Sequence, residues 1–137
     1  MDPEELVELV SVFMSRNKMS VAFPILSREV IDCQLASISA EGDLGIVLEK
    51  LGRGESYRIM VDLFTFDEVP SDVCAEFVGV LLAGRAQVRV WGRWIKFVEL
   101  SLLVGGSVWR ETRRLKDGLR PWELALRAPG DSGHGTR

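Results

Sequence analysis

Arginine and tryptophan alternate within residues 88–110 at a spacing that could bind a nucleic acid. Arg89, Trp91 and Arg93 occupy every second position, so in an extended strand their side chains project from the same face. On such a face the guanidinium groups can contact phosphates while the indole stacks on a base, an interaction worth roughly 1–3 kcal/mol per base. The alternation predicts a groove for single-stranded nucleic acid.

Further basic and aromatic residues could extend this groove. The additional candidate contacts are Lys96, Trp109, Arg110, Tyr57 and Arg58. The basic run at 113–116 could also contact phosphate, although a run of this kind is most often simply solvated. Trp94 and Phe97 are expected to pack in the core or in a loop.

Each of these assignments has a structural alternative. Trp91 could close the end of a β-barrel, which would leave Arg89 and Arg93 as ordinary solvated charges. Trp109 is equally well explained as a buried side chain. The pattern favours a nucleic-acid contact without deciding which tryptophan makes it.

Basic side chains concentrate in the second half of the chain. Residues 1–80 hold 6 basic and 15 acidic side chains, whereas residues 81–137 hold 11 basic and 5 acidic ones. The two parts carry net charges of −9 and +6 within a total of −3. This asymmetry favours a second half that faces a polyanion or a partner. One asparagine and two glutamines in the whole chain are a scarcity typical of thermophile proteins.

Little in the sequence supports catalysis. Cys33 and Cys74 have no second cysteine or histidine at ligand spacing, so neither a metal site nor a disulfide framework is expected. The acidic residues Asp62, Asp67 and Glu68 have no histidine or nucleophile motif beside them. We expect a protein that is not an enzyme and that uses no cofactor and no metal.

Nothing in the sequence indicates a membrane span or a secretion signal. No apolar run reaches the roughly 18 residues that a span needs. The first residues are acidic, whereas a signal peptide begins with basic ones. We expect a cytoplasmic protein without a membrane partner.

Amphipathic helices are expected near both ends of the chain. Residues 2–16 place apolar side chains on one helical face, and a short helix begins at Pro121. These apolar stripes could cover the core of the domain or dock on another subunit. The residues that would form such a partner surface are Leu6, Leu9, Val10, Phe13, Trp122 and Leu126.

Five strands and one further helix are expected between these ends. Alternation and turn residues predict the strands, and the helix runs from 70 to 83, closed by Gly84. The strands are expected at 30–40, 44–51, 57–66, 88–93 and 100–104, with the last pattern resuming at 108–110.

This order of elements is that of an OB-fold, a five-stranded barrel with one helix between strands three and four. We predict a mainly β protein with flanking helices. Residues 1–17 form the N-terminal helix, residues 18–127 form the OB-fold domain with the short C-terminal helix, and residues 128–137 form a disordered tail.

Residues 84–110 resemble the last two strands of replication protein A-type OB domains. The likeness rests on a V-x-V-x-G strand from Val88 to Gly92, on Phe97, on the strand Leu100-Ser-Leu-Leu-Val and on Val108. It is greatest with the middle subunit of that complex and with its telomere-capping relatives. The resemblance implies a subunit that binds single-stranded DNA in replication and repair, and that assembles with other OB-fold subunits into a hetero-oligomer.

Two departures from that family favour a second hypothesis, a structural assembly subunit without direct DNA contact. The family often has an Asp-Asp-Gly-type turn before its third strand, whereas this chain has Gly52-Arg53-Gly54-Glu55. The first half of the chain is also strongly acidic. Both departures favour a subunit that serves in assembly rather than as the main DNA-binding subunit.

A third hypothesis is a PilZ-like barrel that binds a cyclic dinucleotide. Ser37-Ile-Ser39-Ala-Glu-Gly42 is one residue away from the D/N-x-S-x-x-G signature of those domains. Their double-arginine motif is reduced here to Arg16 and Arg28.

Overall fold

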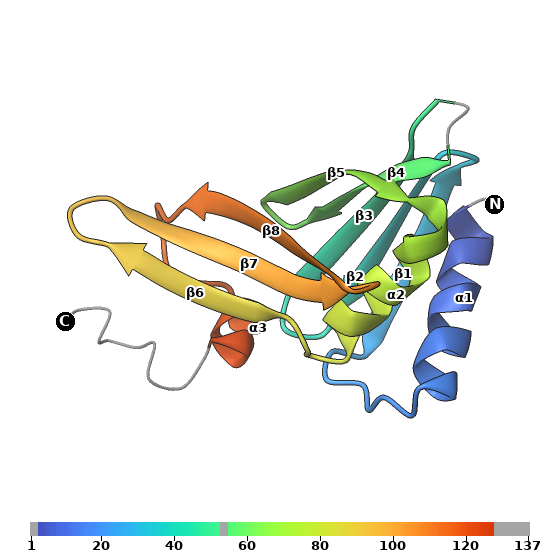
Figure 1. Cartoon of the computed structure of the whole chain (residues 1–137), viewed down its shortest axis with the longest axis horizontal. Helices are drawn as coiled ribbons and strands as arrows, with labels where there is room; N and C mark the ends of the chain where they lie inside the picture. Colours follow the sequence, from blue (N-terminus) through green and yellow to red (C-terminus); the bar gives the residue numbers. More distant parts are fainter. Residues whose placement is uncertain (1–2, 53–54, 128–137) are drawn as a thin grey trace.

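The computed structural model describes residues 3–52 and 55–127, which form two antiparallel sheets and three helices (Figure 1). The expectation of a mainly β protein with flanking helices is confirmed. None of the described helices is long and apolar enough to cross a membrane. In chain order the elements are α1 (Pro3–Arg16), β1 (Ile25–Asp32), β2 (Leu35–Ala40), β3 (Leu44–Lys50), β4 (Ser56–Val61), β5 (Phe64–Pro70), α2 (Ser71–Leu82), β6 (Gln87–Gly92), β7 (Lys96–Val104), β8 (Ser107–Arg114) and α3 (Pro121–Leu126).

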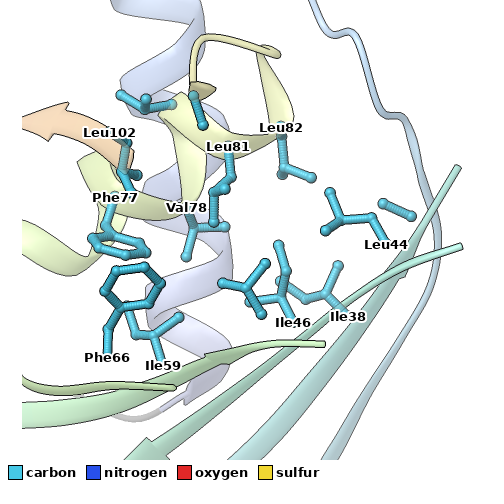
Figure 2. Packing of buried hydrophobic residues seen from close by; sticks show 14 of the residues in the cluster. Ile38, Leu44, Ile46, Ile59, Phe66, Phe77, Val78, Leu81, Leu82 and Leu102 are labelled. Carbon is cyan, nitrogen blue, oxygen red and sulfur yellow. The ribbon is translucent and has the colours of Figure 1, made fainter. Parts of the chain in front are cut away.

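The first sheet is a five-stranded meander in the order β1-β2-β3-β4-β5, in which neighbours in sequence pair antiparallel. Every second side chain of β2, β3 and β4 is buried, as expected for a sheet covered on one face. Ile38, Ile46 and Ile59 of that face belong to the core beneath the helices (Figure 2). β1 lies at the edge, and all of its residues are exposed.

Two tight turns divide segments that the sequence predicts as single strands. Residues 33–34 separate β1 from β2, and residues 62–63 separate β4 from β5. Val61 pairs directly with Phe64 across the second turn, so both are buried while Leu63 is 72% exposed. The predicted continuous strands over 30–40 and 57–66 are therefore wrong. Asp62 makes the second turn without glycine by taking a φ of 51°, a conformation that Asp tolerates.

α2 is buried between the two sheets and joins them. The ring of Phe77 meets Phe66 of β5 edge-on, with ring centroids 5.0 Å apart. The same ring meets Trp109 of β8 edge-on at 5.9 Å. Figure 2 shows Phe77 between Phe66 and Leu102 of β7. Through this one ring, α2 contacts both sheets within a single core.

The second sheet has the order β6-β7-β8, and β7 packs on α2. Figure 1 shows it projecting away from the first sheet beyond α2. Within the described residues no strand of one sheet pairs with a strand of the other, so no closed barrel forms. The expected five-stranded barrel is replaced by eight strands, with α2 after the fifth. The additional strands arise from the two turns and from β8, which continues through the polar residues up to Arg114.

The apolar stripes of the terminal helices pack on this core. Their side chains are therefore occupied within the chain rather than presented to a partner, which corrects most of the expected partner surface. Leu9, at 43% exposed, is the member of that set that remains accessible. The members that lie in the core or against it are Leu6, Val10, Phe13, Trp122 and Leu126.

α1 approaches α2 closely at Gly79. A Cβ atom at this position would lie 2.6 Å from Cδ2 of Phe13 and 3.3 Å from Cγ of Met14. The first of these distances is shorter than van der Waals contact allows. The absence of a side chain at Gly79 is what lets the Phe13 ring rest on α2.

We predict that Gly79→Ala destabilises the protein. A glycine-to-alanine change inside a helix normally stabilises it by up to about 1 kcal/mol, but overpacking against the Phe13 ring should cost about 1–3 kcal/mol. Urea denaturation gives the net change in the free energy of unfolding. In a Phe13→Ala background the ring is gone, and the same substitution should become stabilising. A single variant more stable than the wild type, or an equal effect of Gly79→Ala with and without the Phe13 ring, would contradict the close packing.

Candidate nucleic-acid interface

The second sheet leaves one face uncovered, which we call the outer face. Across β6 and β7 the register aligns Trp91 with Phe97, and across β7 and β8 it aligns Phe97 with Arg114. Side chains of aligned residues share a face. The intervening residues, such as Val88 and Leu100, are buried on the side of α2. The outer face consists of Gln87, Arg89, Trp91, Phe97, Glu99, Ser101, Leu103, Val108, Arg110, Thr112 and Arg114.

A stacked aromatic pair lies on the outer face. The rings of Trp91 and Phe97 have centroids 5.8 Å apart and planes inclined by 30°. The guanidinium carbon of Arg89 lies 5.9 Å from the centre of the Trp91 ring, a distance at which a cation is attracted to the π-system. Trp91 is 40% exposed. It therefore lies on the surface of the sheet, and the alternative that it plugs a barrel end does not apply.

Positive charge predominates on the outer face. It carries Arg89, Arg110 and Arg114 against the single acid Glu99. Nη1 of Arg89 lies 3.9 Å from Oε1 of Glu99, at the limit of an ion pair. Within the described residues, no carboxylate pairs with Arg110 or Arg114. Two of the three guanidinium groups thus remain available to an anionic ligand.

The turn between β6 and β7 carries a second exposed tryptophan. Trp94 is 92% exposed at the tip of this hairpin, beside Ile95 at 47%, so the expectation that it packs in the core or a loop is wrong. Gly92 permits the turn, because a Cβ there would lie 2.1 Å from the carbonyl oxygen of Ile95. Arg93 and Lys96 are also exposed near the tip. They flank the outer face without belonging to it. The prediction that Arg93 shares a strand face with Arg89 and Trp91 is therefore wrong, because β6 ends at Gly92.

Three of the candidate contacts lie elsewhere. Trp109 is on the inner side of β8, aligned with Leu102, and its indole nitrogen is buried without a hydrogen-bond partner. Tyr57 is 1% exposed in the core. Arg58 lies on the first sheet, where its guanidinium nitrogens are 2.7 Å from Asp67 and 3.1 Å from Glu49. None of the three can join the outer face.

The outer face also includes residues that the sequence analysis did not assign to it. Phe97 was expected to pack in the core or in a loop, and Arg114 was only part of a charge run. Leu103 and Val108 are aligned with each other at the opposite end of the face and are 63% and 55% exposed. The alternation of β8 beyond Arg110 would have placed Arg114 on the face, but its polar composition conceals a strand.

The elements of the PilZ-like signature have structural explanations. Gly42 adopts a φ of 80° in the turn before β3, and its carbonyl oxygen accepts a hydrogen bond of 3.0 Å from the backbone N–H of Trp122. Arg16 ends α1, whereas Arg28 lies in β1 opposite Ile38. No group of three or more metal-ligating side chains occurs in the described part of the chain.

Two carboxylates, those of the buried Glu123 and the partly buried Asp62, hold α3 against both sheets and so fix the end of β8. The indole nitrogen of Trp122 donates a short hydrogen bond to Asp62, whose second oxygen accepts one of 3.2 Å from the backbone N–H of Gly45. Nη2 of Arg113 lies 2.7 Å from both oxygens of Glu123. Burial raises the pKa of Asp62 above 3.8, although the hydrogen bonds to its carboxylate oppose this.

Comparisons with models of protein families, with curated proteins and with solved structures found no match to this chain. The functional argument therefore depends on the geometry described above.

We predict that the advantage of wild type over Asp62→Asn, measured as free energy of unfolding, shrinks as pH rises. A raised pKa means that the folded state binds this proton more tightly than the unfolded chain does. The resulting stability is present at low pH and is lost as pH rises through the raised pKa. At neutral pH the variant should still be less stable by about 1–3 kcal/mol, because an amide cannot accept both hydrogen bonds.

Urea denaturation of both proteins at a series of pH values, from neutral down to mildly acidic but above 3.8, measures this difference in the free energy of unfolding. A difference that grows with pH would contradict a raised pKa.

Proposed function

We propose that this chain binds single-stranded DNA on the outer face of its second sheet. The observation that carries the proposal is the stacked Trp91–Phe97 pair on an uncovered sheet face that also carries Arg110 and Arg114, which have no carboxylate partner within the described residues. Bases stack on such aromatic surfaces with little regard to sequence, while a basic groove tracks the backbone. The proposed ligand therefore contacts the aromatic pair with its bases and the arginines with its phosphates at the same time.

The size of the face is compatible with several nucleotides. Arg110 and Arg114 are four residues apart on β8, which corresponds to roughly 13 Å along an extended strand. Arg89 lies on the opposite edge strand, β6. The guanidinium groups thus border the aromatic pair on two sides, and phosphates on either side of a stacked base have a partner.

The resemblance to replication protein A supports this proposal at the level of strands. Residues 84–110 contain β6, β7 and the first residues of β8, which supply most of the outer face. We propose that the likeness reflects strands that face DNA, in a subunit of a larger assembly. The barrel that the family builds from such strands is not part of the proposal.

A second candidate function is an assembly subunit that uses the same face for protein contact. It is favoured by Leu103 and Val108, an aligned aliphatic pair that is more than half exposed. Exposed apolar patches of this kind often mark protein interfaces. Substitutions in two regions of the face separate the candidates. Those at Trp91 and Arg110 should weaken DNA binding most, whereas those at Leu103 and Val108 should weaken protein contact.

We predict that the protein binds fluorescently labelled oligo-dT at low salt and that two substitutions weaken this binding differently. Trp91→Ala should reduce affinity about tenfold through the loss of one stacked base, with the thermal midpoint nearly unchanged because the ring is on the surface. Arg110→Gln should weaken binding to all sequences alike and lower the slope of log affinity against log salt by about one. Fluorescence anisotropy titrations measure both effects.

Arg16→Gln provides the matched control. Arg16 is an exposed arginine at the end of α1, outside the second sheet, and its loss should leave both affinity and salt slope unchanged. Affinity weaker than millimolar for the wild type at low salt would rule out the DNA-binding proposal. A protein that fails to bind DNA but forms oligomers disrupted by Leu103→Ser would favour the assembly function.

A further inference from the structure

A basic pocket lies at the end of β8, next to the outer face but outside it. Its volume is about 340 Å³. Four of its lining residues are basic, namely Arg113, Arg114, Lys116 and Arg120. Asp117 is the one acid among the lining residues, and Leu63 and Gly118 complete the wall.

The pocket is formed by three segments that meet after β8. Arg113 and Arg114 are consecutive in the strand and so project to opposite sides of the sheet. Lys116 and Arg120 come from the connection to α3, and Leu63 comes from the turn between β4 and β5. An enclosure of this kind suits a compact charged group better than a continuous chain.

Two of the four cations are paired with carboxylates. Arg113 is paired with Glu123, which is 0% exposed. Nε of Arg120 lies 3.7 Å from Asp62, and its backbone N–H donates to Glu123 over 2.8 Å. The Arg113–Glu123 pair fixes one guanidinium group in the wall before any ligand arrives, and the backbone hydrogen bond fixes the main chain at Arg120.

The other two cations, Arg114 and Lys116, have no carboxylate partner within the described residues. Both side chains are exposed. The pocket therefore combines rigid positive groups with free ones, and the free ones can turn toward an anion at little cost.

The pocket continues the outer face directly. Arg114 is aligned with Phe97 across β7 and β8, so it borders both the aromatic pair and the pocket. The backbone N–H of Leu115 donates a hydrogen bond of 2.8 Å to the carbonyl oxygen of Lys96, which holds the start of the connection against the hairpin. A strand lying across Trp91 and Phe97 would reach the pocket at one of its ends.

We propose that this pocket binds a terminal phosphate group, and that its source is the end of the DNA strand held on the outer face. The proposal rests on the proposed function. A terminal phosphate carries between one and a half and two negative charges near pH 7 and three acceptor oxygens, more than a phosphodiester within the chain. One guanidinium group can donate two parallel hydrogen bonds to two of these oxygens. The cluster of cations thus matches the end of a strand better than its interior.

The test compares three oligo-dT ligands of equal length, with a 5′ phosphate, with a 3′ phosphate or with hydroxyl groups at both ends, each labelled at an internal position. One phosphorylated form should bind roughly fivefold more tightly than the hydroxyl form at low salt, the gain from one added charge-assisted contact. Lys116→Gln should bring this ratio to about one. Lys18→Gln, a lysine next to α1, serves as the control and should keep the ratio of the wild type.

The outcomes distinguish this inference from the proposed function. Equal affinity for all three oligonucleotides would overturn the terminal-phosphate site and leave DNA binding intact. If Lys116→Gln brings the ratio of affinities to about one, and Trp91→Ala weakens binding of every oligonucleotide by the same factor, both the terminal-phosphate site and DNA binding are supported. If no oligonucleotide binds but inorganic phosphate binds the wild type in calorimetry and not Lys116→Gln, the strand end is overturned as the source, together with the proposed function.

Discussion

The burial of α2 between two sheets is the constraint on which the rest of the structure depends. Phe77 contacts both Phe66 of the first sheet and Trp109 of the second, so each sheet must turn one face toward the same helix. A strand with one covered face alternates apolar and polar side chains. α1 also covers part of the first sheet, whereas in the described residues the second sheet packs against α2, α3 and strand β5. Its other face, with Trp91, is left to solvent.

Two polar interactions of α3, which act as anchors, then determine where that exposed face ends. The Arg113–Glu123 pair and the Trp122–Asp62 hydrogen bond tie α3 to β8 and to the first sheet. Breaking a buried pair by removing one partner typically costs 3–5 kcal/mol, because the remaining charge is left without compensation. The same anchors hold two cations in the wall of the basic pocket. Stability and the arrangement of charge therefore depend on the same side chains at the end of the second sheet.

Sequence patterns predicted the helices and the Arg89–Trp91 face well, but not the way in which strands combine. Val61 and Phe64 are both apolar across a turn without glycine or proline, so alternation alone could not reveal that β4 ends at Val61. Trp109 and Trp91 look equivalent in sequence, and only the register with β7 places one inward and one outward. Arg114 could not be assigned to the outer face from the sequence, because the polar composition of β8 hides the alternation of a strand. Pairing partners are tertiary information that local periodicity does not contain.

The central claim is that the outer face of the second sheet binds single-stranded DNA. Backbone amide chemical shifts, followed by NMR during titration with oligo-dT, test it residue by residue. The largest changes should occur around Trp91 in β6, around Phe97 in β7 and between Arg110 and Arg114 in β8, while α1 and β1 stay unchanged. Changes confined to α1 and β1, or no changes at millimolar oligonucleotide, would contradict the account.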